Sequence, residues 1–483
     1  MNKKDLSPRC VFEQFARINE IPRPSKREEK MIAYLMEFGQ SRGLPTKRDA
    51  VGNVLISKGA TPGYEDRQTL ILQSHMDMVC EKLVDVDFDF DKDAIQTYID
   101  GEWLKAKGTT LGADDGIGCA MELALLDSDD IEHGPIECVF TRDEETGLTG
   151  AFGMEAGFMS GKMLINLDSE DEGQIFVSCA GGKTTTATFT FDREKAPKGY
   201  FFMEATLKGL NGGHSGDDIN KKRANAVKLL VRFIYQEMEK GTVRLGTLKA
   251  GGLHNAIPRD GEMTIAVPFA QKEQVRADFN VFVSNVEEEF HVTEKNINMY
   301  MESTDAEPLI TEDDSRKIIL ALQGVDNGIM SMCQDQAIEW LVETSSNLAS
   351  VKTQEDGSVL VTTSQRSNVM SALDNMCATV RAIFQLAGAE VDTGEGYPAW
   401  KMNPNSRLTK IVVDTYKELF GKEPKVLGIH AGLECGLFAE RYPNLDMVSM
   451  GPTLRGVHSP DERLLIPTVD MVWRHLLEIL KKA

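Results

Sequence analysis

The side chains best suited to chemistry in this chain follow a predicted strand, in the stretch TLILQSHMD (residues 69–77). Residues 69–72 are apolar or β-branched and predict a buried strand. His75 and Asp77 stand where that strand ends. A neutral imidazole there is a good metal ligand, and a carboxylate two residues later can hold its other nitrogen and fix its tautomer. His-x-Asp triplets are common on protein surfaces, so the interpretation depends on what other strand ends carry.

Four further elements carry suitable side chains. They are GADDG (residues 112–116), DEE (143–145), LDS (167–169) and GVHSP (456–460). One Asp of the first element can cap the helix predicted after it, which leaves the second Asp unexplained. Three adjacent acids in a loop are usually solvated surface. These acids follow a buried strand, however, and sites in α/β sheets gather outside the carboxyl ends of the strands.

A charge argument favours a metal site. Several carboxylates in one cleft cannot all stay ionised without cations. Two imidazoles and three or more carboxylates, with no thiolate, suit zinc and tolerate cobalt or manganese. One carboxylate shared between two ions, with a His and a carboxylate for each, describes a two-metal hydrolase whose spare Glu can be the general base. Spacing alone does not distinguish Asp114 from Asp115, or Glu144 from Glu145.

The elements that must position these residues predict an α/β domain. Strands alternate with helices, which indicates a largely parallel sheet. The N-terminal part has a helical region at 9–43 broken at 21–24, strands at 54–56, 70–72, 136–141 and 163–167, and a helix at 116–126. The pattern returns after residue 397, with a helix at 406–420, strands at 425–429 and 447–450, and a last helix from 468.

Between these stretches the pattern changes to that of an α+β domain. From residue 184 the chain alternates as an exposed antiparallel strand would. A β-α-β-β-α order follows, with strands at 201–207, 242–249 and 261–267 and helices at 222–240 and 272–289. A similar set recurs, with helices at 314–323 and 368–387 and strands at 341–353 and 358–364. Two ferredoxin-like halves in tandem are expected. We therefore expect a catalytic domain of residues 1–183 and 397–483 around an inserted domain of residues 184–396.

Composition excludes several classes of partner. At 483 residues the chain is too long for one core. Its formal charge is 53 − 75 = −22, which argues against nucleic acid and anionic membrane as partners. No apolar signal segment and no run of membrane-spanning length is seen. The eight cysteines are scattered without a Cys-x-x-Cys pair, which is typical of reduced thiols and predicts a cytoplasmic protein.

The motif series resembles a known family. HMD, GADDG, DEE, LDS and VHSP are similar, in this order, to the motifs of the di-zinc M20 family of aminopeptidases, dipeptidases and amidohydrolases. The resemblance covers essentially the whole chain. Many members carry Lys after the paired acid, where this chain has Gly116. That departure, in TTLGADDGIG, and the context TRDEETGLTG resemble the Xaa-His dipeptidase branch.

The resemblance implies a fold and an activity. The fold is a mixed, mostly parallel sheet sandwiched by helices, of the zinc-peptidase type, with an inserted lid or dimerisation domain that can form a homodimer. The activity is metal-dependent hydrolysis of small peptides, Xaa-His dipeptides including carnosine-like ones, with two divalent ions, Zn²⁺ or alternatively Co²⁺ or Mn²⁺. The resemblance assigns metal ligation to His75, Asp114, Glu145, Asp168 and His458.

The resemblance also assigns the roles within this set. Asp114 would bridge the two ions, and Asp77 would orient His75. Glu144 would be the general base. Asp168 would share an ion with His75, and the other ion would be held by Glu145 and His458.

Three residues of the inserted domain are candidates for substrate binding. His214 lies in the Gly-rich NGGHSG, which unaided predicts a turn with a surface His. In the family a His at this place binds substrate and stabilises the oxyanion, reaching the site from a partner subunit or by lid closure. Asn255 in LHNAIPR and Arg366 in SQRSN are weaker candidates, although Arg suits a terminal carboxylate. The segment AGLECG (431–436) is either a pocket floor or a plain turn.

Two other functions remain open at this point. One is an N-acyl-amino-acid amidohydrolase with the same metal centre. The other is a non-catalytic metal-binding relative, which would have lost a ligand or the base, and neither is lost here. Nucleotide-binding glycine motifs are absent from the sequence.

Overall fold

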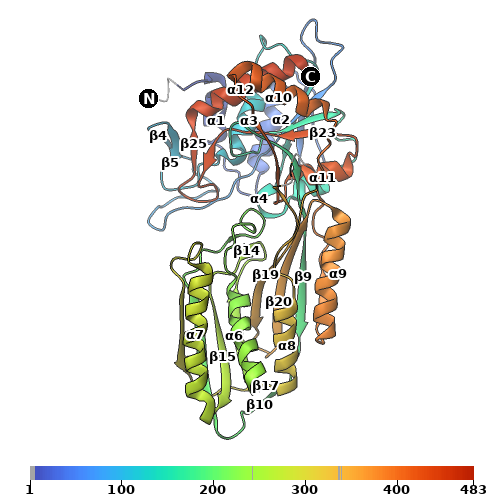
Figure 1. Ribbon diagram of the computed structural model, residues 1–483. Coiled ribbons are helices and arrows are strands. Elements are labelled where there is room, and N and C mark those ends of the chain that lie inside the picture. Colours follow the sequence, from blue (N-terminus) through green and yellow to red (C-terminus); the bar gives the residue numbers. More distant parts are fainter. Residues whose placement is uncertain (1–5, 242, 335–337, 339) are drawn as a thin grey trace. The chain divides into compact units, whose positions relative to one another are not determined.

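The computed structural model describes residues 6–241, 243–334, 338 and 340–483, and its chain divides into two compact units. Unit 1 comprises residues 1–178, 400–428 and 433–483, and unit 2 comprises residues 179–399 and 429–432 (Figure 1). The boundaries at 178 and 399 fall a few residues from those expected at 183 and 396. The short return of residues 429–432 to unit 2 was not predicted.

Unit 1 is built on a mixed eight-stranded sheet. Its four central strands pair in parallel, whereas the flanking pairs β1–β2, β2–β6 and β23–β8 are antiparallel. The predicted mixed sheet is confirmed, and its parallel pairs are those between the four central strands. In spatial order the strands are β1 (Thr46–Arg48), β2 (Val54–Lys58), β6 (Ile136–Thr141), β3 (Leu70–His75), β7 (Met163–Asn166), β23 (Asp446–Ser449), β8 (Gln174–Cys179) and β22 (Lys425–Ile429).

Helices pack on this sheet through one large apolar core. Alternate residues of β3, such as Leu70 and Leu72, share that core with five helices. The predicted break after the first helix is confirmed; it contains Pro22 and Pro24, and proline removes a backbone donor. The five helices are α1 (Arg9–Ile18), α2 (Glu29–Ser41), α3 (Ala113–Leu126), α10 (Arg407–Phe420) and α12 (Ile466–Lys482).

Shorter elements complete unit 1. A four-stranded sheet has the order β24 (Leu454–Arg455), β25 (Arg463–Leu465), β5 (Trp103–Ala106) and β4 (Thr97–Asp100). The remaining helices are α4 (Glu144–Gly147), α5 (Thr149–Gly153) and α11 (Glu434–Arg441).

Unit 2 is built on a nine-stranded sheet, eight strands of which belong to two ferredoxin-like halves. Two short pairs lie outside this sheet: β10 (Arg193–Glu194) with β17 (Leu309–Ile310), and β12 (Gly213–His214) with β14 (Ala256–Ile257). The first half is β11 (Tyr200–Lys208), α6 (Ala226–Lys240), β13 (Arg244–Gly251), β15 (Gly261–Pro268), α7 (Lys272–Phe290) and β16 (Asn298–Ser303). The second is β9 (Gly181–Phe189), α8 (Glu312–Gly324), β19 (Val342–Thr353), β20 (Val359–Ser367), α9 (Met370–Leu386) and β21 (Glu390–Thr393). Both halves follow the β-α-β-β-α-β order, and they join where β13 pairs with β19.

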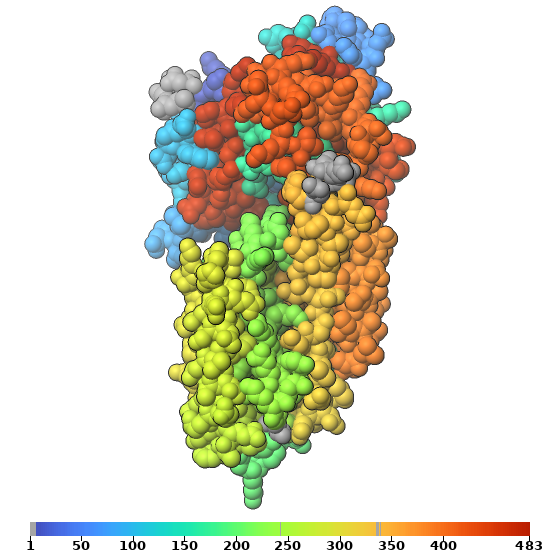
Figure 2. Space-filling view, viewed as in Figure 1, coloured from blue at the N-terminus to red at the C-terminus, as the bar shows by residue number. Residues whose placement is uncertain are grey.

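The halves are nested, so the expected tandem arrangement was wrong. The first strand of the second half, β9, precedes the whole first half in the chain. An extra strand, β18 (Gly328–Met332), pairs with β19. The helices α7, α6 and α8 lie side by side over one face of the sheet (Figures 1 and 2). Their shared core includes alternate residues of β11, namely Met203, Ala205 and Leu207.

Two predicted elements of unit 2 are shifted. The helix expected from residue 222 begins at Ala226, because the Asn225 side chain caps it by accepting the Lys228 amide. The strand expected at 242–249 is β13, which starts at Arg244; residue 242 lies outside the described residues. Within the described part of the chain, no helix is long and apolar enough to cross a membrane.

Candidate metal centre

Parallel pairing brings the predicted strand ends to one edge of the unit 1 sheet. His75, the last residue of β3, stands opposite Thr141, the last residue of β6. The acids at 143–145 therefore follow the strand next to His75. On the other side, β3 pairs with β7, whose last residue, Asn166, precedes Asp168 by two positions.

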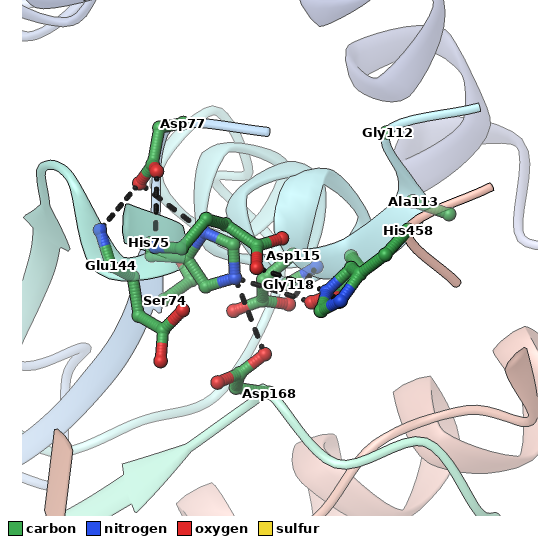
Figure 3. A network of polar contacts seen from close by, with 12 residues as sticks. Ser74, His75, Asp77, Gly112, Ala113, Asp115, Gly118, Glu144, Asp168 and His458 are labelled. Carbon is green, nitrogen blue, oxygen red and sulfur yellow. Dashed lines mark hydrogen bonds and ion pairs between the residues drawn. The ribbon is translucent and has the colours of Figure 1, made fainter. Parts of the chain in front are cut away.

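Three of the predicted residues form a first candidate ligand group. The Nε2 atom of His75 lies 3.2 Å from Oδ1 of Asp114 and 3.4 Å from Oδ1 of Asp168. One ligand atom from each of the three lies within 4.8 Å of the others. His75 is 1% exposed, so the group is shielded from water on the imidazole side (Figure 3).

A second group shares Asp114 with the first. Oδ2 of Asp114 lies 3.1 Å from Nε2 of His458, which is also 2.9 Å from Oε2 of Glu145. Asp114 thus presents one carboxylate oxygen to each imidazole. Asp115 has a different surrounding, since its Oδ1 accepts the amide of Gly118 at 3.2 Å inside α3.

Asp77 connects the imidazole to the acidic loop. Its Oδ1 lies 3.4 Å from Nδ1 of His75, on the opposite side of the ring from Asp168 (Figure 3). It also accepts the backbone amides of Glu144 at 3.0 Å and Glu145 at 3.3 Å. Burial acts to raise the pKa of Asp77, but His75, the amide of Glu144 and the hydroxyl of Ser25 outweigh it and hold the pKa below its ordinary value. An ionised Asp77 therefore fixes both the ring and the loop.

The electrostatics of the cluster call for cations. Burial raises the pKa of Asp168 to about 7. Hydrogen bonds to Asp114 and Glu145 raise the pKa of His458 to about 11. Burial opposes a charge on His75, yet the neighbouring carboxylates hold its pKa well above the ordinary value. Negative charge is therefore concentrated in this cluster, and the donor set of imidazoles and carboxylates fits divalent ions that would neutralise it.

Among the described residues, no hydrogen bond or ion pair like those of the other acids holds the Glu144 side chain. Its backbone amide is bound to Asp77, while its side chain is directed toward the cluster (Figure 3). Burial, together with the charges of Asp168, Glu145 and Glu434, raises its pKa well above the ordinary value. A carboxylate with a raised pKa beside a water-binding site is suited to accept a proton.

Glu434 was not among the predicted site residues, because its segment AGLECG was interpreted only as a pocket floor or a plain turn. Its Oε2 accepts Nε2 of Gln73 at 2.7 Å and Oγ1 of Thr141 at 2.8 Å, at the ends of β3 and β6. Burial raises the pKa of Glu434 to about 7. An acid embedded in the apolar and glycine residues of AGLECG was the only available signal.

A third group of acids lies near the metal centre, and neighbouring hydrogen-bond donors stabilise its carboxylates. Glu28, Asp77 and Asp143 are close together and buried. Glu28 is paired with Arg142 at 2.6 Å, and Asp143 accepts the hydroxyls of Thr146 and Thr149. This group therefore supports the acidic loop and needs no ion.

In unit 2 the predicted His214 and Arg366 meet. Arg366 is 5% exposed, and no acid pairs with it among the described residues. Its guanidinium donates to Oη of Tyr397 at 2.5 Å and to Oγ of Ser215 at 3.4 Å. Nη2 of Arg366 also lies 3.3 Å from Nε2 of His214.

These two side chains present donors to the same space. Nδ1 of His214 accepts the amides of Gly216 at 3.3 Å and Asp217 at 3.2 Å, so a neutral ring carries its proton on Nε2. Burial and the charge of Arg366 lower the pKa of His214. The two donors lie 3.3 Å apart, and among the described residues no acid pairs with Arg366. This arrangement is suited to an anion, and we call it the anion site.

The neighbourhood of this anion site includes two further residues. His430 shares a hydrogen bond with Ser345, with 2.7 Å between Nε2 and Oγ, and burial lowers its pKa to about 3. The third predicted substrate residue, Asn255, contacts the site through its main-chain carbonyl, which accepts the Ser215 amide at 2.8 Å.

Comparison with known proteins identifies the family. Residues 71–482 match the model of Peptidase family M20/M25/M40. The chain belongs to this family. It is 42% identical, over 99% of its length and 98% of the relative's, to the cytosol non-specific dipeptidase of Escherichia coli (strain K12).

Two solved peptidase structures resemble this chain. The aminoacylhistidine dipeptidase from Vibrio alginolyticus superimposes with a TM-score of 0.90 at 42% identity, covering 100% of this chain and 98% of that one. The aminopeptidase PepT from Bacillus cereus ATCC 10987 has a TM-score of 0.58 at 15% identity, with 99% of both chains covered, and shares the fold.

Proposed function

We propose that this M20 peptidase is a metal-dependent dipeptidase, with Xaa-His dipeptides among its substrates. The observation that carries the proposal is the position of Asp114, whose two oxygens face two separate imidazoles. The two relatives at 42% identity are both named dipeptidases, one non-specific and one for aminoacylhistidine substrates. The name of the E. coli relative supports a cytosolic location.

The ligands of the two ions follow from the two groups. His75 and Asp168 would hold one ion, Glu145 and His458 the other, and Asp114 both. Zinc suits this set of nitrogen and oxygen ligands, and cobalt or manganese would be tolerated. Bound there, the ions would lower the pKa of a water and polarise the peptide carbonyl.

Glu144 would move the proton. Its raised pKa suits a group that takes a proton from the attacking water and returns it to the leaving amine. Asp77 would keep His75 in the tautomer whose Nε2 is free to bind an ion, because a carboxylate oxygen 3.4 Å from Nδ1 favours a hydrogen on that nitrogen.

The anion site of unit 2 would hold the substrate. A dipeptide ends in a carboxylate, which the guanidinium of Arg366 can bind with charge-assisted hydrogen bonds. The Nε2–H of His214 would stabilise the negative charge that develops on the scissile carbonyl. Asn255 stays a candidate for the same site, and a homodimer through unit 2 stays a prediction.

The proposal is tested with a substrate panel. Purified protein loaded with Zn²⁺ is assayed on Xaa-His dipeptides, other dipeptides and N-acetyl amino acids. Hydrolysis of dipeptides well above that of N-acetyl amino acids is expected. A preference for N-acetyl amino acids would instead identify an amidohydrolase with the same centre.

A further inference from the structure

The turn into α3, residues 111–114, ends in the non-helical first residues of that helix and carries Asp114. This loop is held by two buried side chains of opposite charge. One is Glu462, which is 2% exposed, and the other is Arg23, which is 1% exposed. Neither residue is itself a proposed metal ligand. Neither forms an ion pair with any described residue of the chain.

Glu462 binds the amide side of the loop. Its Oε2 accepts the amides of Leu111 at 2.7 Å and Gly112 at 3.0 Å. Its Oε1 accepts those of Ala113 at 2.7 Å and Asp114 at 3.3 Å. Four successive backbone donors thus converge on one carboxylate. Because Glu462 follows His458 by four residues, this contact ties the segment of one proposed ligand to that of another.

Arg23 binds the carbonyl side. Its Nη1 donates to the carbonyls of Met76 at 3.2 Å and Asp77 at 2.7 Å, and its Nη2 donates to the carbonyl of Gly112. The guanidinium therefore connects the segment after His75 to the loop that carries Asp114.

The glycine after the paired acid makes room for this arginine. A Cβ atom on Gly116 would lie 2.6 Å from Nη2 of Arg23 and 3.2 Å from Cε2 of Phe15. A side chain at position 116 would therefore displace the guanidinium of Arg23.

We propose that Glu462 and Arg23 are positioning residues that set the spacing of the three ligand-bearing segments. Burying a charge without an ion partner is costly unless hydrogen bonds satisfy it, and here only the backbone of these segments does so. Through them the carboxylate of Asp114 is kept between the imidazoles of His75 and His458. Residues that orient metal ligands typically change metal affinity by about ten- to a hundredfold when replaced.

The test uses full-length protein with three variants and two controls. Glu462→Gln keeps the shape but puts an amide donor against backbone donors, Arg23→Met removes the guanidinium, and Gly116→Ala displaces it. Asp461→Asn and Arg27→Met are matched controls, because both residues are exposed neighbours in the chain. Zn²⁺ affinity and stoichiometry are measured by competition with a chelator. The rise in thermal midpoint on adding Zn²⁺ is measured in parallel.

The expected result is about a ten- to hundredfold weaker Zn²⁺ affinity in the three variants and a smaller Zn²⁺-induced rise in midpoint, with both controls unchanged. A purely structural role would lower the midpoint of the metal-free protein and leave the Zn²⁺-induced rise intact, and that would overturn the proposal. The inference rests on the proposed two-metal function. If the unmodified protein binds no Zn²⁺, the proposed function fails; if it binds Zn²⁺ as tightly as its variants do, only the positioning role fails.

Discussion

The buried carboxyl of Glu434 predicts a pH dependence of stability that one substitution removes. Its pKa is raised to about 7 by burial, against an ordinary value of 4.5. In the folded, metal-free protein the group therefore keeps its proton up to near neutral pH, while in the unfolded chain it loses it from about pH 4.5 upward. The free energy of unfolding is thus unaffected by Glu434 below that pH, falls as pH rises to about 7, and is level above it.

The magnitude follows from the two pKa values. Their separation, at about 1.36 kcal/mol for each pH unit, makes the ionised carboxyl cost about 3 kcal/mol above pH 7. Between pH 5 and pH 8 the linkage relation gives a loss of about 2.5 kcal/mol. In Glu434→Gln the side chain stays neutral, and its amide oxygen can still accept from Gln73 and Thr141.

Chemical denaturation of the metal-stripped protein at pH 5 and pH 8 measures this. Glu434→Gln should be more stable than the unmodified protein at pH 8 by about 2.5 kcal/mol more than at pH 5. Glu440→Gln is the matched control, because Glu440 is an exposed residue of the same helix α11. Equal pH dependence in the unmodified protein and in Glu434→Gln would refute the reasoning.

Three further predictions concern catalysis and binding. Glu144→Gln should retain both ions by elemental analysis yet lose turnover by roughly 10²–10⁴-fold, as expected for a missing general base; full activity would remove Glu144 from this role. Asp114→Asn should bind fewer than two Zn²⁺ ions per chain, whereas Asp115→Asn should keep two; the reverse outcome would mean that the wrong acid was assigned. Arg366→Met should raise KM for dipeptides by about 10–100-fold, from the loss of a charged hydrogen bond, with a smaller change for dipeptide amides. An equal rise for both substrates would count against carboxylate binding.

The strand ends could be predicted from the sequence because they depend on local patterns. A buried apolar run followed by His75, or by the acids at 143–145, places these side chains at the carboxyl end of a strand whatever the wider topology. Parallel pairing of β3 with β6 and β7 then brings them together. The sequence pattern does not show which acid of each pair faces the cluster. Asp114 and Asp115 have the same side chain at adjacent positions, and only the course of the backbone at the start of α3 turns one toward the cluster and the other away.

Longer-range contacts could not be predicted in the same way. The nesting of the unit 2 halves depends on β9 pairing with β20 across more than 150 positions of sequence, and no local pattern reports such pairing. The same holds for Arg23 and Glu462, which reach the loop at 111–114 from opposite ends of the chain. Glu434 is comparable, because only the fold reveals that an acid in a glycine-rich turn is fully buried.

The central claim is that two ions bridged by Asp114 activate dipeptide hydrolysis. Its most direct test is elemental analysis combined with an Xaa-His dipeptide assay on the same sample, before and after chelation and after Zn²⁺ is restored. Two ions per chain are expected, with loss of hydrolysis when they are removed and recovery when they return. Undiminished hydrolysis by protein that holds no metal would contradict it.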